Sequence, residues 1–192
     1  MPSLIAVDTP DAILPQYRGT PIESLLQYQN LGIPVPASSG HTQLLISMCM
    51  DYRKDLRVPG EFAYVLRSAG GGLRDSEFEV SYAIAVGGVR WLAVVTHTDC
   101  GMVRVMDTRD AFVRGLAEHA GWSRDAGEAL FDRSAPGHYI GEAVAYALSE
   151  TRRLRVLYPK IPVAPLLYRV EDDRLLQILE EQPGPTRPAS AG

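Results

Sequence analysis

Residues 43–53 read Gln43-Leu44-Leu45-Ile46-Ser47-Met48-Cys49-Met50-Asp51-Tyr52-Arg53, a mostly apolar run that ends in a polar cluster. The arrangement returns at Trp91-Leu92-Ala93-Val94-Val95, which leads into His97-Thr98-Asp99-Cys100-Gly101. Near-continuous apolar runs of this length indicate strands that are buried on both faces. Functional side chains gather at the carboxyl ends of such strands in open α/β sheets. We therefore expect both polar clusters at one rim of a parallel sheet.

Strand and helix patterns alternate along the rest of the chain. Further strands are predicted at 62–66 and 162–170. Helical spacing of apolar residues predicts helices around 21–28, 78–86 and 105–116, and a further helix that includes 140–148 and ends before Pro159. The turn Glu171-Asp172-Asp173-Arg174 before Leu175–Leu179 predicts a hairpin at one edge. The expected fold class is α/β, with a single domain. Its mainly parallel central sheet is flanked by helices and has an antiparallel edge strand or hairpin near the carboxyl terminus.

The two ends of the chain differ from its centre in composition. Residues 1–40 are rich in proline and polar residues and have little core of their own, which predicts an arm that wraps a neighbour. Residues 41–181 form the predicted folded domain that carries both polar clusters, and residues 182–192 have the composition of a disordered tail. An arm and an exposed sheet edge favour a homodimer or higher homo-oligomer, because symmetric dimers are the commonest assemblies.

Composition excludes several classes of function. The 192 residues carry a net charge of −4, so no basic surface for nucleic acid is expected. No apolar run is long enough to span a bilayer, and the amino terminus lacks the pattern of a secretory signal. A cytoplasmic protein that acts on a small molecule is therefore expected.

Cys49, His97 and Cys100 form a candidate metal-ligand set. Taken singly, each cysteine is more often an inert core residue and the histidine a helix-capping residue. Taken together, two thiolates and an imidazole at one sheet rim are typical zinc ligands, and Asp51 lies two residues after the first thiolate. A free pair of thiolates that binds metal suits a reducing compartment better than a disulfide.

Three segments resemble the signature segments of the β-class carbonic anhydrases, in the family's order and at similar spacing. These are Cys49-x-Asp51-x-Arg53, Arg67-Ser68-Ala69-Gly70-Gly71 and His97-Thr98-Asp99-Cys100-Gly101. The likeness extends from about Leu44 to Leu179. It implies a zinc lyase that reversibly hydrates carbon dioxide to bicarbonate, with Cys49, His97 and Cys100 as the zinc ligands, and an amino-terminal arm that embraces a second subunit.

Asp51 and Arg53 are the expected catalytic pair. If Asp51 binds zinc, it closes the tetrahedron as a fourth ligand, and no water is activated. If Arg53 holds Asp51 away, the fourth position is open and Asp51 orients a metal-bound hydroxide. The resembled family shows both arrangements, and both remain open at this point.

The chain departs from the family pattern at Ser68, where asparagine is usual, and at Tyr52 and Thr96, which are expected to add bulk near the metal. This bulk motivates a second hypothesis, hydrolysis of carbonyl sulfide or carbon disulfide. A third hypothesis is a non-catalytic interaction protein that zinc stabilises, with Asp51 permanently bound to the metal. The remaining histidines, His41, His119 and His138, are not expected to be ligands.

Overall fold

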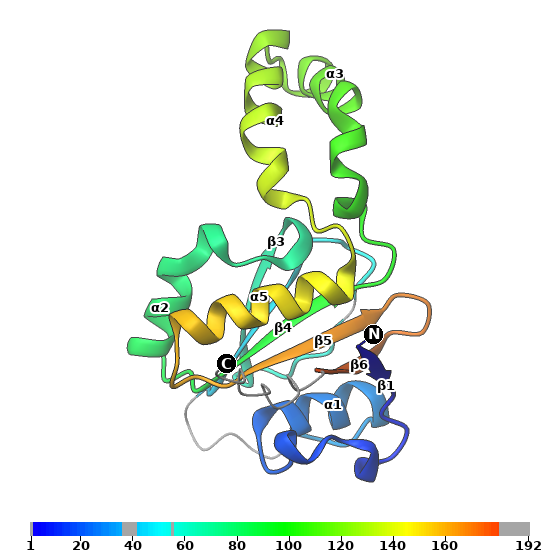
Figure 1. Ribbon diagram of the computed structural model, residues 1–192, viewed down its shortest axis with the longest axis vertical. Coiled ribbons are helices and arrows are strands. Elements are labelled where there is room, and N and C mark those ends of the chain that lie inside the picture. Colours follow the sequence, from blue (N-terminus) through cyan, green and yellow to red (C-terminus); the bar gives the residue numbers. More distant parts are fainter. Residues whose placement is uncertain (1, 36–41, 55, 181–192) are drawn as a thin grey trace, which may run out of the picture.

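A computed structural model of the protein describes residues 2–35, 42–54 and 56–180 (Figure 1). The predicted tail at 182–192, His41 and the last residues of the predicted arm lie outside the described residues.

The described residues form one mixed sheet with the strand order β1-β6-β5-β4-β2-β3. The strands are β1 (Ser3–Ile5), β2 (Leu44–Cys49), β3 (Ala63–Ser68), β4 (Trp91–His97), β5 (Val163–Arg169) and β6 (Arg174–Leu179). Strands β3, β2, β4 and β5 are mutually parallel, whereas β6 pairs antiparallel with β5 and β1 antiparallel with β6. The predicted α/β class, with a parallel centre and an antiparallel hairpin at the carboxyl-terminal edge, is confirmed.

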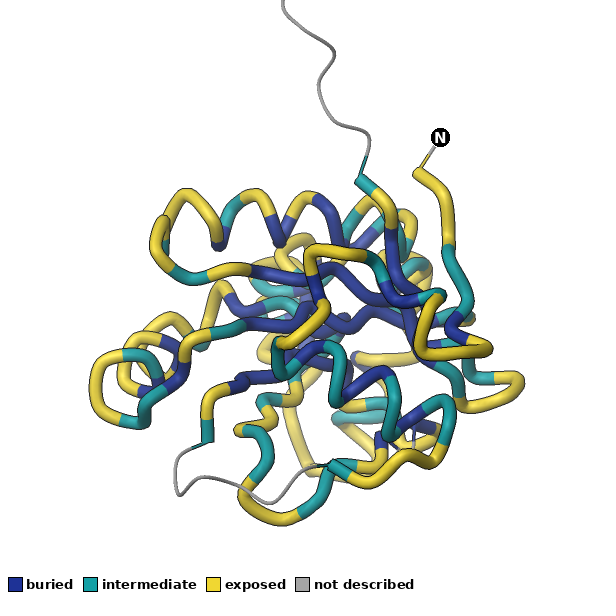
Figure 2. The backbone as a smooth tube through the Cα atoms, turned by 90° about the horizontal axis from the view of Figure 1, so that it is seen from below, coloured by how far each residue is buried: buried dark blue, intermediate teal, exposed yellow. Residues whose placement is uncertain are grey.

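Helices cover both faces of this sheet (Figure 1). Helix α1 (Pro21–Leu31) lies on one face, and α2 (Glu77–Ala85) and α5 (Ala143–Leu157) lie on the other; α3 (Arg109–Ala120) and α4 (Arg124–His138) lie beyond the sheet. Alternate side chains of a strand point to opposite faces, so Leu44 and Ile46 of β2 pack on the side of α1, and Leu45 packs on the side of α2 and α5. The central strands are therefore buried on both faces, as predicted, and they run through the middle of the molecule in Figure 2.

The amino-terminal segment contributes to the core of its own chain, unlike the prediction that it has little core. Val7, Ile13, Ile22, Leu25 and Leu26 are almost completely buried in the cluster under α1. The apolar residues of this segment are spaced among prolines and polar residues, and short 3₁₀ turns followed by α1 bring them to one side. Composition alone therefore underestimated how much apolar surface the segment buries.

Two helical regions differ from their predictions. Helix α2 has the predicted extent, but its buried residues are Val80 and Ala83, and the predicted apolar face with Phe78 and Tyr82 is largely exposed. The helix expected at 105–116 is divided into a 3₁₀ helix, η5 (Gly101–Thr108), and α3.

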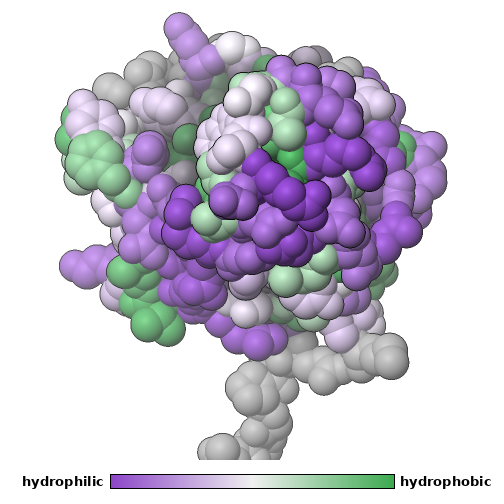
Figure 3. Space-filling model, turned by 90° about the horizontal axis from the view of Figure 1, so that it is seen from above, coloured by the Kyte–Doolittle hydropathy of each residue, from purple (hydrophilic) through white to green (hydrophobic). Residues whose placement is uncertain are grey.

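Helix α4 was not predicted. With α3 it forms a hairpin that projects from the body of the molecule (Figure 1). Arg109 of α3 forms an ion pair with Asp132 of α4, with Nε 2.7 Å from Oδ1. Hydrophilic side chains cover most of this end of the molecule, with small hydrophobic patches between them (Figure 3). In the part of the chain that is described, no helix has the length and apolar character that crossing a membrane requires.

The loop that follows β3 is fixed by polar side chains from three elements. The Ser47 hydroxyl of β2 donates to the Gly71 carbonyl, and the Ser68 hydroxyl of β3 donates to the Gly72 carbonyl at 2.6 Å. Glu150 of α5 accepts from the Leu73 amide at 3.0 Å. Because this loop lies against the end of β2, its anchoring also fixes one wall of the polar rim.

Glu150 is a buried carboxylate whose charge is balanced by hydrogen bonds. Arg153 donates to it through Nε at 2.9 Å and through Nη2 at 2.8 Å. Burial raises the pKa of Glu150, but the hydrogen bonds from Arg153 and from the Leu73 amide outweigh burial and lower the pKa below its usual range. A carboxyl group with a lowered pKa in the folded state stabilises the fold above its unfolded pKa, and this contribution is lost as the pH falls.

We predict that Glu150→Gln lowers the free energy of unfolding by about 1–3 kcal/mol at pH 7, because a neutral amide replaces the acceptor of these charged hydrogen bonds. The difference from the wild type should shrink below about pH 4, where the carboxyl group of the unfolded chain is protonated. Urea unfolding at both pH values measures this, with Glu79→Gln on the exposed side of α2 as the control. A difference of equal size at both pH values would contradict the assignment.

Candidate metal centre

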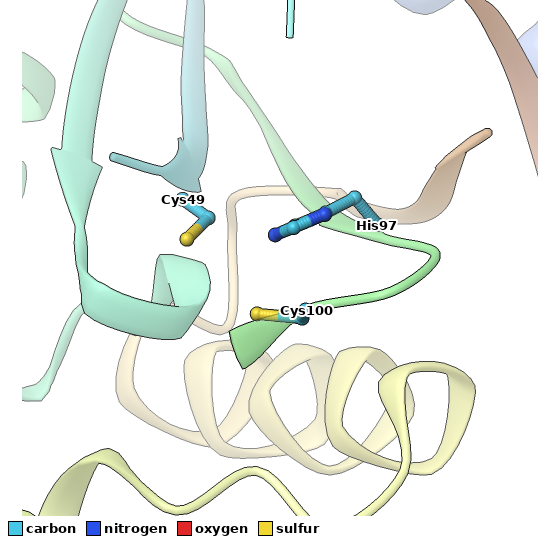
Figure 4. A group of neighbouring side chains, drawn as sticks. All are labelled: Cys49, His97 and Cys100. Atoms are coloured by element: carbon cyan, nitrogen blue, oxygen red, sulfur yellow. The ribbon is translucent and has the colours of Figure 1, made fainter. Parts of the chain in front are cut away.

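The sheet topology brings the two polar clusters together. Cys49 ends β2 and His97 ends β4, and these strands are parallel neighbours, with Met48 of β2 opposite Val95 of β4. Cys100 follows in the turn before η5, for which it is the residue that precedes the first helical position. The two sulfur atoms and the imidazole ring point toward a common point (Figure 4).

The geometry of this cluster fits a metal ion. One potential ligand atom from each of Cys49, His97 and Cys100 lies within 4.8 Å of the others, and all three residues are buried. A tetrahedral zinc ion with two sulfur ligands and one nitrogen ligand holds these atoms about 3.5–4 Å apart. A small inward movement of the side chains would therefore complete a site with three protein ligands and one open position.

His97 has the tautomer that metal binding needs. Its Nδ1 lies 2.8 Å from the Thr98 carbonyl oxygen, which can only accept, so Nδ1 carries the proton. Nε2 then has a free lone pair, and among the described residues this buried atom has no hydrogen-bond partner. An unpaired buried nitrogen is costly. A metal ion at the centre of the cluster would satisfy it.

The thiol groups of Cys49 and Cys100 are coupled through a hydrogen bond. This hydrogen bond lowers the pKa of Cys49 well below its usual range against the effect of burial. The same hydrogen bond and burial raise the pKa of Cys100, which retains the proton, whereas the Met102 amide at the start of η5 acts in the opposite direction. Both sulfurs must be thiolates to bind a metal ion, so metal binding would release the proton that Cys100 retains.

Arg53 holds Asp51 beside the cluster and outside it. Its Nη2 lies 2.7 Å and its Nε 3.1 Å from the Asp51 carboxylate, and the backbone amide of Arg53 donates to the same carboxylate at 3.0 Å. Hydrogen bonds from Arg53 lower the pKa of Asp51 well below its usual range, so the carboxylate is ionised. Asp51 Oδ2 is 4.0 Å from His97 Nε2. Of the two arrangements left open by the sequence, the described conformation has Asp51 paired with arginine.

Asp99 is a second carboxylate partner of Arg53 that the sequence analysis did not identify. Arg53 Nη1 lies 2.6 Å from Asp99 Oδ2, and Nη2 donates to the Asp99 backbone carbonyl at 2.8 Å. The backbone of Asp99 has a φ of 52°, a conformation that aspartate tolerates better than most residues. The turn between His97 and Cys100 therefore also positions the guanidinium group, which remains in place if Asp51 moves.

Gly71 allows the loop after β3 to approach Cys49. Its φ is 80°, and a Cβ atom there would lie 3.1 Å from the backbone nitrogen of Cys49 and 3.2 Å from the carbonyl carbon of Met48. Any larger residue would push directly on the backbone that carries a candidate ligand.

The other residues singled out in the sequence lie outside the cluster. Tyr52 is 92% exposed, so its side chain adds no bulk to the site, which differs from the expectation. Thr96 is buried and its hydroxyl donates to the Leu166 carbonyl of β5 at 3.5 Å. His119 lies in α3 and His138 at the end of α4, and neither contributes to the cluster.

Comparisons with known proteins agree with this architecture. No protein-family model matches the sequence, and the search of curated proteins gives no match. Among solved structures, the chain is similar to β-carbonic anhydrase isoform I from Trichomonas vaginalis, with a TM-score of 0.60, 21% identity and coverage of 81% of this chain and 93% of that chain. The carbonic anhydrase from Glaciozyma antarctica gives a TM-score of 0.58 at 18% identity, with 86% and 99% covered. A carbon disulfide hydrolase gives 0.53 at 24% identity, with 80% and 84% covered. The chain therefore has the fold of the β-carbonic anhydrases, as the resemblance implied.

We predict that Cys49→Ser, His97→Ala and Cys100→Ser each lose bound zinc, because each removes one of the three converging donor atoms. Zinc content after dialysis of the purified full chain measures this, with His119→Ala in α3 as the control. Full zinc retention by any of the three variants would remove that residue from the ligand set.

We predict that Gly71→Ala weakens zinc binding by about 10-fold or more, because it displaces the backbone of Cys49. Gly121→Ala is the matched control, since Gly121 has a similar φ of 71° but a Cβ there meets no atom within 4 Å. Both variants should lose about 1–2 kcal/mol of stability from backbone strain. Equal zinc affinity in the two variants would show that the close approach has no effect on the site.

Proposed function

We propose that the protein is a zinc-dependent carbonic anhydrase that reversibly converts carbon dioxide and water to bicarbonate and a proton. The observation that carries the proposal is the buried, unpaired Nε2 of His97, which faces two cysteine sulfurs beside an ionised Asp51 held by Arg53. The fold shared with solved carbonic anhydrases supports the same reaction.

Cys49, His97 and Cys100 would hold the zinc ion. Bound zinc supplies Lewis acidity and makes water acidic enough to react near neutral pH. These three side chains supply two negative charges and one neutral donor, and their burial keeps bulk solvent away from the donors.

Asp51 would position the attacking water. Its carboxylate is ionised and accepts hydrogen bonds, and it lies 4.0 Å from the free nitrogen of His97, within reach of a water molecule beside the cluster, on the side of Asp51. A hydrogen bond from this water to Asp51 would aim an oxygen lone pair at the carbon of carbon dioxide. The new bond to carbon forms as one carbon–oxygen double bond becomes single, and the released proton passes to solvent.

Arg53 would keep Asp51 available for this role. The guanidinium group binds the carboxylate through two nitrogen atoms and is itself anchored by Asp99. Such two-point pairing is directional as well as strong. It opposes a swing of Asp51 into the metal cluster, where the carboxylate would close the fourth position.

The same candidate metal ligands could serve a second reaction, the hydrolysis of carbon disulfide or carbonyl sulfide. A solved carbon disulfide hydrolase shares the fold. The sequence favoured these substrates because Tyr52 and Thr96 were expected to add bulk near the metal. Tyr52 is exposed and does not narrow the site, so it gives no support to this alternative. The non-catalytic alternative requires Asp51 on the metal, and the pairing of Asp51 with Arg53 opposes it.

We predict that Asp51→Asn retains zinc and loses carbon dioxide hydration by about 100-fold or more, because an amide binds arginine poorly and its uncharged oxygen is a weaker hydrogen-bond acceptor for the attacking water. Stopped-flow hydration with zinc-loaded protein measures this, and Asp107→Asn, which alters an exposed residue of η5, is the control.

Hydration by Asp51→Asn at the wild-type rate would contradict the role of Asp51. Release of hydrogen sulfide from carbon disulfide by a wild type that does not hydrate carbon dioxide would favour the hydrolase. Inactivity of zinc-loaded wild type toward all three substrates would favour the non-catalytic protein.

A further inference from the structure

Thr98 lies in the turn between two of the candidate metal ligands, directly after the end of β4. Its amide donates to the Tyr168 carbonyl of β5 at 3.0 Å, which extends the pairing of the two strands by one hydrogen bond. Its carbonyl accepts from Nδ1 of His97 at 2.8 Å. The backbone of Thr98 therefore joins the sheet on one side and holds the ring of a candidate ligand on the other.

The hydroxyl group of Thr98 is held by the hairpin that joins β5 to β6. It accepts a hydrogen bond from the Val170 amide at 3.0 Å, and it donates one to the Glu171 carboxylate at 3.0 Å. A hydroxyl group has one proton, and donation of this proton to Glu171 leaves the oxygen lone pairs for the amide. The amide, the carbonyl and the hydroxyl of Thr98 thus all have partners.

The strand register shows that one of these hydrogen bonds departs from the regular pattern. Strands β4 and β5 are parallel with His97 opposite Tyr168, so Thr98 follows opposite Arg169. In a parallel ladder the amide of a residue donates to the residue before its partner, and its carbonyl accepts from the residue after its partner. The Thr98 amide obeys this rule with Tyr168. The Val170 amide, however, donates to the Thr98 hydroxyl in place of the Thr98 carbonyl.

The hydroxyl group therefore substitutes for the backbone carbonyl at the end of the ladder. This substitution leaves the carbonyl available to His97. Without the hydroxyl, the Val170 amide would need another acceptor, and the regular parallel pattern supplies this same carbonyl. The amide and the imidazole would then compete for it.

We propose that Thr98 is a positioning residue of the metal centre, whose hydroxyl group replaces its own carbonyl in the sheet so that the carbonyl can orient His97. Donation from Nδ1 fixes the ring and leaves Nε2, which is buried without a partner among the described residues, beside the two sulfurs (Figure 4). Partners of this kind raise metal affinity because they hold the ligand in place. The inference rests on the zinc binding of the proposed function and does not depend on its substrate.

Thr96 provides a matched comparison on the same strand. Its hydroxyl also donates to a carbonyl of β5, that of Leu166, at 3.5 Å. Valine has the shape of threonine without the hydroxyl group, so Thr96→Val and Thr98→Val each remove one side-chain link to β5 or its hairpin. Only Thr98 also carries the carbonyl that His97 uses. A difference between the two variants therefore reports on this carbonyl.

The first test measures the zinc affinity of the full chain by competition with a chromophoric chelator. Thr98→Val should bind zinc about 10-fold more weakly than the wild type, because competition for the carbonyl loosens the His97 ring. Thr98→Ser keeps the hydroxyl and should restore most of the affinity, and Thr96→Val should match the wild type. Equal zinc affinity in Thr98→Val and Thr96→Val would overturn the proposal.

The second test observes the hydrogen bond directly and needs no metal. In metal-free full chain with isotopically labelled histidine, nuclear magnetic resonance should show the His97 proton on Nδ1, in slow exchange with water, because the ring is buried and bonded to Thr98. Thr98→Val should speed this exchange about 3- to 10-fold, as expected when one neutral hydrogen bond weakens. A wild-type proton on Nε2, or an exchange rate unchanged in Thr98→Val, would overturn the proposal.

Thermal unfolding separates this role from a structural one. Zinc affinity is compared at a temperature where the metal-free variants are folded, and Thr98→Ala, which is smaller and fits the same space, should lose the same affinity as Thr98→Val. The result therefore does not depend on the folding of a single variant. Loss of stability with unchanged zinc affinity would identify Thr98 as a structural residue and overturn the proposal.

These outcomes also separate the two proposals. Zinc affinity that depends on Thr98, in a protein that does not hydrate carbon dioxide, would refute the proposed function and retain the role of Thr98. Hydration by the wild type, with zinc affinity unchanged in Thr98→Val, would retain the function and refute the role of Thr98. A wild type that binds no zinc would refute both.

Discussion

The parallel pairing of β2 with β4 is the constraint on which the rest of the site depends. These strands are neighbours at the centre of the sheet, and both end at the same rim, so Cys49 and His97 are delivered side by side although 48 residues separate them in the sequence. The apolar residues of both strands are buried on two faces, which prevents a slip in register. A slip of one residue would point the ligand side chains away from each other. The buried strands β2 and β4 thus fix the positions of Cys49 and His97 in the candidate metal centre.

The candidate metal centre contains a buried polar atom that the described residues do not satisfy. His97 Nε2 is buried without a hydrogen-bond partner among the described residues. Such a group costs free energy, and native proteins keep it where a ligand or a function compensates for the cost. The free lone pair of this nitrogen, close to two cysteine sulfurs, fits a metal cation.

Arg53 links the carboxylate of Asp51 to the backbone of the turn between His97 and Cys100. It binds Asp51 on one side and Asp99 on the other, so the residue before Cys100 also fixes the arginine. Movement of Asp51 toward a metal would break one ion pair and leave the second intact. In the described conformation Arg53 and its backbone amide hold the Asp51 carboxylate, and Asp99 holds the arginine from the other side.

Much of the fold could be predicted because its strands are strongly apolar. The runs at Leu44–Cys49 and Trp91–His97 could hardly be anything other than buried strands, and the acidic turn before Leu175 marked the hairpin. Helix α4 was missed because Pro136 and many charged residues obscure its periodicity, and the projecting α3–α4 hairpin buries little surface. The face of α2 was misjudged because Phe78 and Tyr82 are larger than Val80 and Ala83, which are the residues that pack on the sheet.

The sequence by itself determined the fold class and the candidate ligands, because residue type and the order of apolar runs are local properties. Only the tertiary structure decided which residues surround those candidate ligands. Asp99 as a partner of Arg53 and the free lone pair of His97 both depend on which strands are adjacent and on how the turn after β4 folds. Electrostatic interactions act through space between groups far apart in the chain, so the charge balance of the site could be read only from the folded protein.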